Sequence, residues 1–229
     1  LGTYKGANGE EIELGSLLPV DFAKNTRANF HTQGIQALVT DEVEHSSETG
    51  KLIQEPRIWN NLLSSQPLAF NVFGELKNED THYPIATKVF QELLGDEVKE
   101  VTNIEFEYSP GRREEQYTND RTAFDVFVEY SIDEVKQGFA GIEVKYAENM
   151  QDTPSTVKDR YEEIAREMDV FKKSAYPSLK NSQLQQIWRD HLLSGSMYNN
   201  LDYETGWFIF LFPEKNTQCH KVVSNYMDT

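Results

Sequence analysis

Two apolar runs in the middle of the chain carry charges where a buried strand would have none. They are residues 124–128 (FDVFV) and 138–146 (GFAGIEVKY). An unpaired buried charge is costly, so a fold retains one when it is paired, bound to a metal or placed at the edge of an active site. The residues that the sequence must explain are therefore Asp125, Glu143 and Lys145.

Composition limits the class of protein. The 229 residues, 38% of them hydrophobic, are enough for one ordinary domain with some embellishment. The longest apolar run, 207–212, is far shorter than the roughly 20 residues of a membrane helix, so we expect no membrane partner. The lone Cys219 cannot form an internal disulfide, which fits a cytoplasmic protein.

The net charge of −16 disfavours broad, nonspecific binding of nucleic acid, because a polyanion is repelled unless positive charge is concentrated locally or supplied by divalent cations. It does not exclude an active site whose carboxylates hold a metal. Acids lie among the candidate basic groups, which we interpret as solvated surface. These groups are Arg112-Arg113 with Arg121, Lys158 with Arg160, and Lys172-Lys173.

The hydrophobic periodicity predicts alternating helices and strands. Helices are expected from Pro67, from Pro84 to a stop at Gly95, from Thr153-Pro154, and over 182–193; strands are expected around 104–108, over 123–130 and 138–147, and over 207–212. The polar segment 131–137 suits a hairpin turn. This order predicts an α/β fold, a three-layer sandwich around a central mixed β-sheet. Residues 1–55 are expected to be an amino-terminal embellishment, and residues 56–229 the main domain.

The three charges suggest metal chemistry. Residues two apart on a strand face the same side, so Glu143 and Lys145 project together, roughly 7 Å apart along the backbone, and Asp125 can lie beside them. A hard cation such as Mg²⁺ or Mn²⁺ would relieve the repulsion between the two carboxylates, with the backbone carbonyl of Val144 as a further ligand. Such a cation polarises a phosphodiester and activates water. Lys145 would orient or help deprotonate that water, or stabilise charge on phosphorus.

Asp125 followed by Glu143-Val144-Lys145 resembles the signature of the PD-(D/E)XK nuclease superfamily, and the predicted order resembles its αβββαβ core. A narrower similarity, over about residues 56–219, is to a prokaryotic family of restriction-endonuclease-like proteins. It rests on these segments: Ser64-Ser65-Gln66 with Phe70-Asn71, residues 141–146 (GIEVKY), residues 186–193 (QIWRDHLL) and Leu211-Phe212-Pro213. No proline precedes Asp125, where the superfamily name places one.

The resemblance implies a metal-dependent nuclease fold, with Asp125 and Glu143 as metal ligands and Lys145 as the catalytic lysine. The first hypothesis is therefore hydrolysis of phosphodiester bonds in DNA, with RNA as an open alternative. Auxiliary candidates are Gln186 and Arg189, three apart on one helix, then Gln66, and Glu75 as a first-helix glutamate. Three of these have a simpler interpretation: helix surface for Gln186 and Arg189, and a cap or loop hydrogen bond for Gln66.

Two other functions stay open. One is a catalytically silent nuclease-like domain that binds nucleic acid or a protein partner, and the other is a structural domain whose buried ion pair only fixes strand register. A homodimer would be a way to cut both strands of a duplex. Glu105 and Glu107 are expected to be strand surface, and Cys219-His220 terminal surface.

Overall fold

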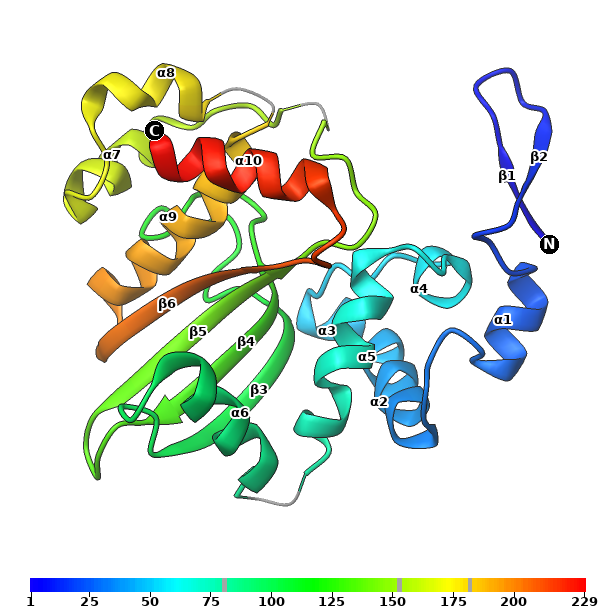
Figure 1. The fold of residues 1–229 in the computed structure, drawn as a ribbon, viewed down its shortest axis with the longest axis horizontal. Helices are drawn as coiled ribbons and strands as arrows, with labels where there is room; N and C mark the ends of the chain where they lie inside the picture. Colours follow the sequence, from blue (N-terminus) through cyan, green and yellow to red (C-terminus); the bar gives the residue numbers. More distant parts are fainter. Residues whose placement is uncertain (80–81, 152–153, 181–182) are drawn as a thin grey trace. The chain divides into compact units, whose positions relative to one another are not determined.

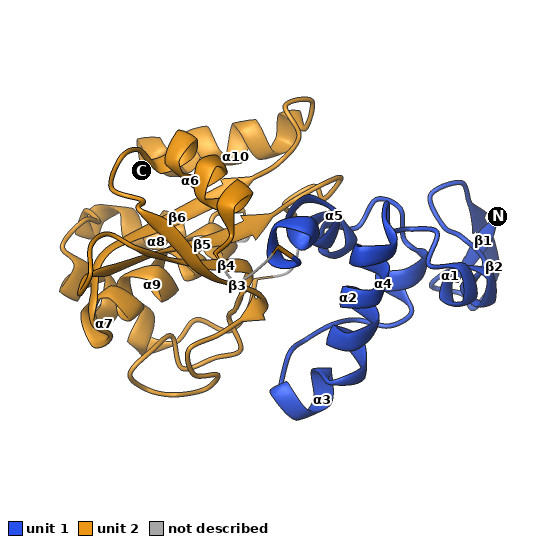
Figure 2. Cartoon of the chain, turned by 90° about the horizontal axis from the view of Figure 1, so that it is seen from below, with its two compact units in different colours: residues 1–78 blue, residues 79–229 orange. Residues whose placement is uncertain are grey.

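The computed structural model describes residues 1–79, 82–151, 154–180 and 183–229, and the chain divides into two compact units, residues 1–78 and 79–229 (Figures 1 and 2). The sequence-based division between residues 55 and 56 stays a prediction beside this structural one.

The first unit is a small hairpin followed by helices. Its elements are β1 (Gly2–Lys5), β2 (Glu11–Leu14), α1 (Val20–Thr26), α2 (Gln33–Glu44), α3 (Ser46–Thr49), α4 (Arg57–Asn60) and α5 (Ser65–Lys77). Helix α5 is the helix predicted from Pro67; it begins two residues earlier, at Ser65, and packs against α2. The two helices approach closely at Gly74, where an added Cβ would lie 3.0 Å from the side chain of Ile35.

The second unit holds a four-stranded mixed sheet. Its elements are α6 (Pro84–Leu94), β3 (Glu100–Tyr108), β4 (Phe124–Ser131), β5 (Gln137–Val144), α7 (Asp159–Met168), a 3₁₀ turn η1 (Lys173–Ala175), α8 (Tyr176–Leu179), α9 (Gln185–Asn200), β6 (Tyr203–Leu211) and α10 (Thr217–Asp228). The strand order is β3-β4-β5-β6, antiparallel except for the parallel pair β5 and β6.

Helices flank this sheet, with α6 on one face and α7 and α9 on the other (Figure 2). Helix α6 packs on β3, and α9 packs on β6 and β5. The predicted α/β sandwich and its αβββαβ core are confirmed, as α6, β3, β4, β5, α9 and β6. Between the sheet and α9 lies an aromatic cluster that includes Phe124, Phe127 and Phe139.

Several element boundaries differ from the sequence prediction. Thr153 and Ser182, where two helices were expected to begin, lie outside the described residues; α7 begins at Asp159, and α9 runs on to Asn200. The last strand begins at Tyr203 instead of residue 207. The interpretation of Cys219 as terminal surface was wrong, because it lies on α10 and is fully buried against the cluster around Trp188.

No helix in the described part of the chain is long and apolar enough to cross a membrane.

Candidate active site

The sheet brings the three predicted charges together at one end of the β4–β5 hairpin. Asp125 is the second residue of β4, and Glu143 is the next-to-last residue of β5, followed by Val144 and then Lys145. The register pairs Val126 with Ile142; continued by one residue, it sets Asp125 opposite Glu143 on the face that α9 covers. The hairpin therefore places Asp125 beside Glu143, as the sequence predicted.

Asp125 is a carboxylate whose ionised form is disfavoured by its surroundings. One oxygen, Oδ2, accepts the backbone N–H of Val144 at 2.7 Å. Burial raises the pKa of Asp125 well above its ordinary value, and the charge of Glu143 raises it further, against the opposing effect of Lys145. Glu107 adds to this effect; it was expected to be strand surface but is half-buried. The two carboxylates thus concentrate more negative charge than their surroundings favour.

Glu143 is held by two donors at the same oxygen. Its Oε1 accepts the Lys145 ammonium at 2.6 Å and the Gln186 amide Nε2 at 2.6 Å, and both acidic and basic side chains are buried. Burial alone would lower the pKa of Lys145, but the charges of Glu143 and Asp125 outweigh it and raise the pKa above its ordinary value. Lys145 is therefore a fixed positive charge beside the two carboxylates.

The backbone after Lys145 is fixed by α10. The side chain of Asn216, the residue before that helix, accepts the N–H of Cys219 at 3.0 Å and donates to the carbonyl of Tyr146 at 2.9 Å. One side chain thus caps the helix and ties down the segment that leaves β5. This contact reduces the freedom of Lys145.

The structure divides the four auxiliary candidates. Gln186 contacts Glu143, whereas Arg189 turns away to Asp120 at 3.3 Å, to Thr122 and to Ser155. Arg189 therefore supports the loop before β4 and does not contact the three charges.

Gln66 and Glu75 belong to the first unit. Gln66 is buried and bonds the backbone of Gln54 and Leu52, which fits the simpler interpretation of a loop hydrogen bond. Glu75 accepts the hydroxyl of Thr32, whose side chain caps α2. Both side chains stabilise the helical unit in which they lie.

Sequence reasoning missed a third carboxylate, Asp190. It lies one helical turn after Gln186 on α9, is 3% exposed, and its Oδ2 is buried without a hydrogen-bond partner among the described residues. Burial raises its pKa well above the ordinary value, and the charge of Glu143 raises it further. The available signal was an aspartate among buried apolar residues of a helix, four positions after a candidate glutamine. We call Asp125, Glu143, Lys145 and Asp190 the charged cluster.

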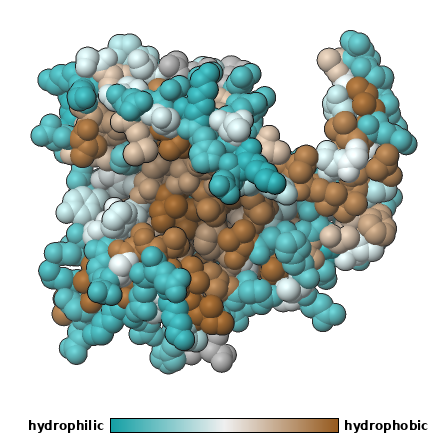
Figure 3. All heavy atoms as spheres, in the orientation of Figure 1, coloured by the Kyte–Doolittle hydropathy of each residue, from teal (hydrophilic) through white to brown (hydrophobic). Residues whose placement is uncertain are grey.

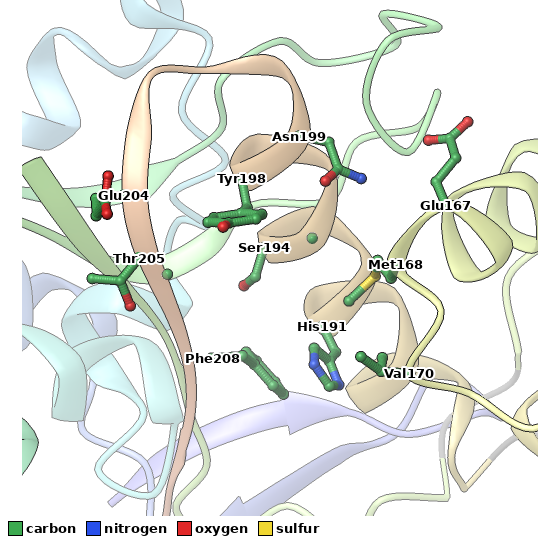
Figure 4. Close-up of a pocket in the computed structure, with 12 residues that line it drawn as sticks. Glu167, Met168, Val170, His191, Ser194, Tyr198, Asn199, Glu204, Thr205 and Phe208 are labelled. Atoms are coloured by element: carbon green, nitrogen blue, oxygen red, sulfur yellow. The ribbon is translucent and has the colours of Figure 1, made fainter.

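A separate pocket lies near the other end of β6. Its volume is about 500 Å³, and α7, α9 and β6 line it with His191, Ser194, Tyr198 and Phe208 among others (Figure 4). The His191 ring stacks on Phe208, and its Nδ1 is 2.9 Å from the hydroxyl of Tyr226. None of the charged cluster lines this pocket, so its walls give no access to the three charges.

The comparison with protein families gives one match. The model of the PD-(D/E)XK nuclease superfamily matches residues 1–229, the whole chain. The chain belongs to this superfamily. No curated protein and no solved structure matches it. Membership implies a nuclease-like function, and it agrees with the resemblance carried by Asp125 and Glu143-Val144-Lys145.

Nucleases of this superfamily typically use a divalent metal, and the residues present fit one. Asp125 Oδ1 and Glu143 Oε2 accept no hydrogen bond from the described residues and are not among the buried unpartnered atoms. Two free carboxylate oxygens beside the Val144 backbone form a hard donor set that suits Mg²⁺ or Mn²⁺. Within the described residues there is no group of three or more acidic, histidine or cysteine side chains that could hold a metal, so such a site would rely on a backbone oxygen or water as well.

Proposed function

We propose that the protein is a metal-dependent nuclease that hydrolyses phosphodiester bonds in DNA, as restriction endonucleases do. The observation that supports this most is the placement of Asp125 and Glu143 opposite each other, with Lys145 bonded to Glu143 at 2.6 Å, at one end of a hairpin in a nuclease fold. A structural ion pair would need only one carboxylate for the lysine. The second carboxylate, Asp125, has a raised pKa partly because Glu143 repels its charge, and a bound cation would reduce that repulsion.

In this proposal Asp125 and Glu143, with the carbonyl of Val144, would hold the cation. Bound Mg²⁺ or Mn²⁺ would polarise the scissile phosphodiester and lower the pKa of a water molecule. The Val144 N–H fixes the Asp125 carboxylate, and Gln186 fixes that of Glu143, so that both keep one oxygen free. Lys145 supplies a positive charge where negative charge develops on the phosphate.

We also propose that the protein acts in the cytoplasm, because Cys219 is a free, buried thiol. The proposed substrate is DNA, and RNA is tested beside it. A homodimer would allow both strands to be cut, and sedimentation of the protein with and without duplex DNA tests that arrangement.

The test of the proposed function is cleavage of plasmid DNA, single-stranded DNA and RNA with Mg²⁺ or Mn²⁺. We expect the wild type to cut DNA and Asp125→Asn to lose the activity. Asp133→Asn is the matched control, because Asp133 is exposed in the turn at the opposite end of the hairpin and its substitution removes the same charge. Metal binding without cleavage of any of the three substrates would favour the silent nuclease-like domain instead.

A further inference from the structure

A cavity of about 300 Å³ lies beside the loop that leads into β4. Its lining is formed by Arg113, Asn119, Asp120, Arg121 and Lys158. The three basic side chains are exposed. We call this feature the basic cavity, and it concentrates positive charge in a chain whose net charge is −16.

The cations of the basic cavity have no acidic partner among the described residues. Arg160, in contrast, binds Glu167 at 2.8 Å and Glu163 at 3.3 Å. The sequence placed Lys158 with Arg160, but the fold groups it with Arg113 and Arg121 instead. The cavity therefore keeps its positive charge available for a ligand.

Asp120, the one acid in the lining, does not neutralise these cations. Its Oδ1 accepts the hydroxyl of Thr118 at 2.8 Å and the N–H of Thr122 at 2.8 Å, and its Oδ2 accepts the hydroxyl of Tyr161 at 2.5 Å and lies 3.3 Å from Arg189. Burial alone would raise the pKa of Asp120, but the hydrogen bonds from Thr122 and Tyr161 lower it below the ordinary value. Asp120 thus stabilises the loop, and Arg189 already balances the charge of the Asp120 carboxylate.

The loop that carries the arginines is held in place. Arg112 donates to the carbonyl of Arg121 at 2.8 Å and to that of Glu107 at 3.0 Å, which ties both ends of the loop together. The backbone N–H of Arg113 bonds the carbonyl of Asp120. The cations are therefore presented by an ordered loop, which reduces the entropy lost when an anion binds.

The basic cavity lies close to the charged cluster along β4. Arg121 precedes Asp125 by four residues, and four residues of extended chain span at most about 14 Å. At a rise of about 3.4 Å per step along one strand, this upper limit corresponds to at most about four nucleotides of a duplex. Arg189 provides a second link, since it reaches the loop from the position next to Asp190 on α9.

We propose that the basic cavity binds a backbone phosphate of the nucleic-acid substrate, within a few nucleotides of the bond that is cut. This inference rests on the proposed function. It explains how a highly acidic nuclease could bind a polyanionic substrate, because the basic cavity supplies positive charge locally. Three cations make this contact, and contacts to phosphate carry no sequence information, so the contact contributes affinity without sequence preference.

The test compares a triple variant, Arg113→Gln with Arg121→Gln and Lys158→Gln, with the wild type. The matched control is Lys172→Gln with Lys173→Gln and Lys221→Gln, which removes three exposed cations from elsewhere in the second unit. Binding of labelled single-stranded and double-stranded oligonucleotides is followed by fluorescence anisotropy over a range of salt concentrations, with Ca²⁺ in place of Mg²⁺. Circular dichroism shows whether each variant is folded, and the single substitution Lys158→Gln serves if the triple variant is not.

We expect the slope of log affinity against log salt to fall by about one unit in the triple variant, because one phosphate contact is lost, and to change much less in the control. Replacing one phosphate at a time by an uncharged methylphosphonate should identify a position that weakens wild-type binding but not the binding of the triple variant. Equal salt dependence in the triple variant and the wild type would overturn the inference while leaving the proposed function intact. A wild type that binds neither oligonucleotide would contradict both.

Discussion

Without metal, the Asp125→Asn variant should be more stable than the wild type. With metal bound, the variant should be less stable than the wild type. Residues opposite each other on antiparallel strands have Cβ atoms about 5 Å apart. Two unit charges at about 5 Å repel by about 3 kcal/mol at an effective dielectric constant of about 20. The continued register of β4 and β5 places Asp125 and Glu143 in this relation.

Two effects reduce this gain. Lys145 offsets part of the repulsion, and the asparagine accepts the Val144 N–H as a neutral group, at a cost of about 1 kcal/mol. We therefore expect the free energy of unfolding of metal-free Asp125→Asn to exceed that of the wild type by about 1 kcal/mol, or about 2–4 °C in melting temperature. A cation at 100 times its dissociation constant stabilises the wild type by about 2.7 kcal/mol, and the variant lacks a ligand for it.

The assay is thermal and urea unfolding of both proteins in EDTA and in excess Mn²⁺. Asp120→Asn is the control, because that carboxylate is held by Thr122, Tyr161 and Arg189 and its loss should destabilise the protein by about 2 kcal/mol in both conditions. If metal-free Asp125→Asn is less stable than the wild type by more than about 1 kcal/mol, repulsion between Asp125 and Glu143 does not dominate at this site. That result would show that Asp125 is a structural partner of Lys145.

The remaining predictions concern Asp190, Gln186 and Gly141. The raised pKa of Asp190 means that its carboxyl group holds a proton more tightly in the folded protein than in the unfolded chain. The free energy of unfolding of the wild type, relative to that of Asp190→Asn, should therefore fall as the pH rises above the ordinary carboxyl pKa of 3.8. A difference in urea unfolding that does not change with pH would contradict this. Gln186→Ala should lower the rate of cleavage about tenfold or more with little change in KM, because it releases one of two donors to Glu143, and an unchanged rate would exclude a positioning role. Gly141→Ala should lower the free energy of unfolding by about 1–3 kcal/mol, because its Cβ would lie 2.5 Å from the Phe124 ring; calorimetric melting without a shift would be inconsistent with this packing.

The sequence predicted the sheet well because its strands are defined by local pattern. The apolar runs around Asp125 and Glu143 became β4 and β5, and the polar segment between them became their turn. Once a hairpin is specified, the register brings the two carboxylates together without further information. The charges at the end of the hairpin could therefore be grouped from sequence alone.

The contributions of the helices could not be predicted in the same way. Arg189 and Asp190 are neighbours on α9, yet Arg189 binds the loop before β4, whereas Asp190 is buried in the charged cluster. The rotation of the helix over the sheet decides which side each residue faces. The basic cavity depends on the same long-range information, since it joins Lys158 to arginines that lie more than thirty residues earlier in the chain. Cys219 was misplaced because the amphipathic pattern of α10 was not recognised.

The most direct test of the account combines metal binding by calorimetry with plasmid cleavage on the same samples of wild type, Asp125→Ala and Lys145→Ala. We expect cleavage to be lost in both variants, and Mg²⁺ or Mn²⁺ binding to be lost in Asp125→Ala but retained in Lys145→Ala. A wild type that binds neither cation, or a Lys145→Ala protein that cuts DNA at the wild-type rate, would contradict the assignment of these residues to a metal-dependent nuclease site.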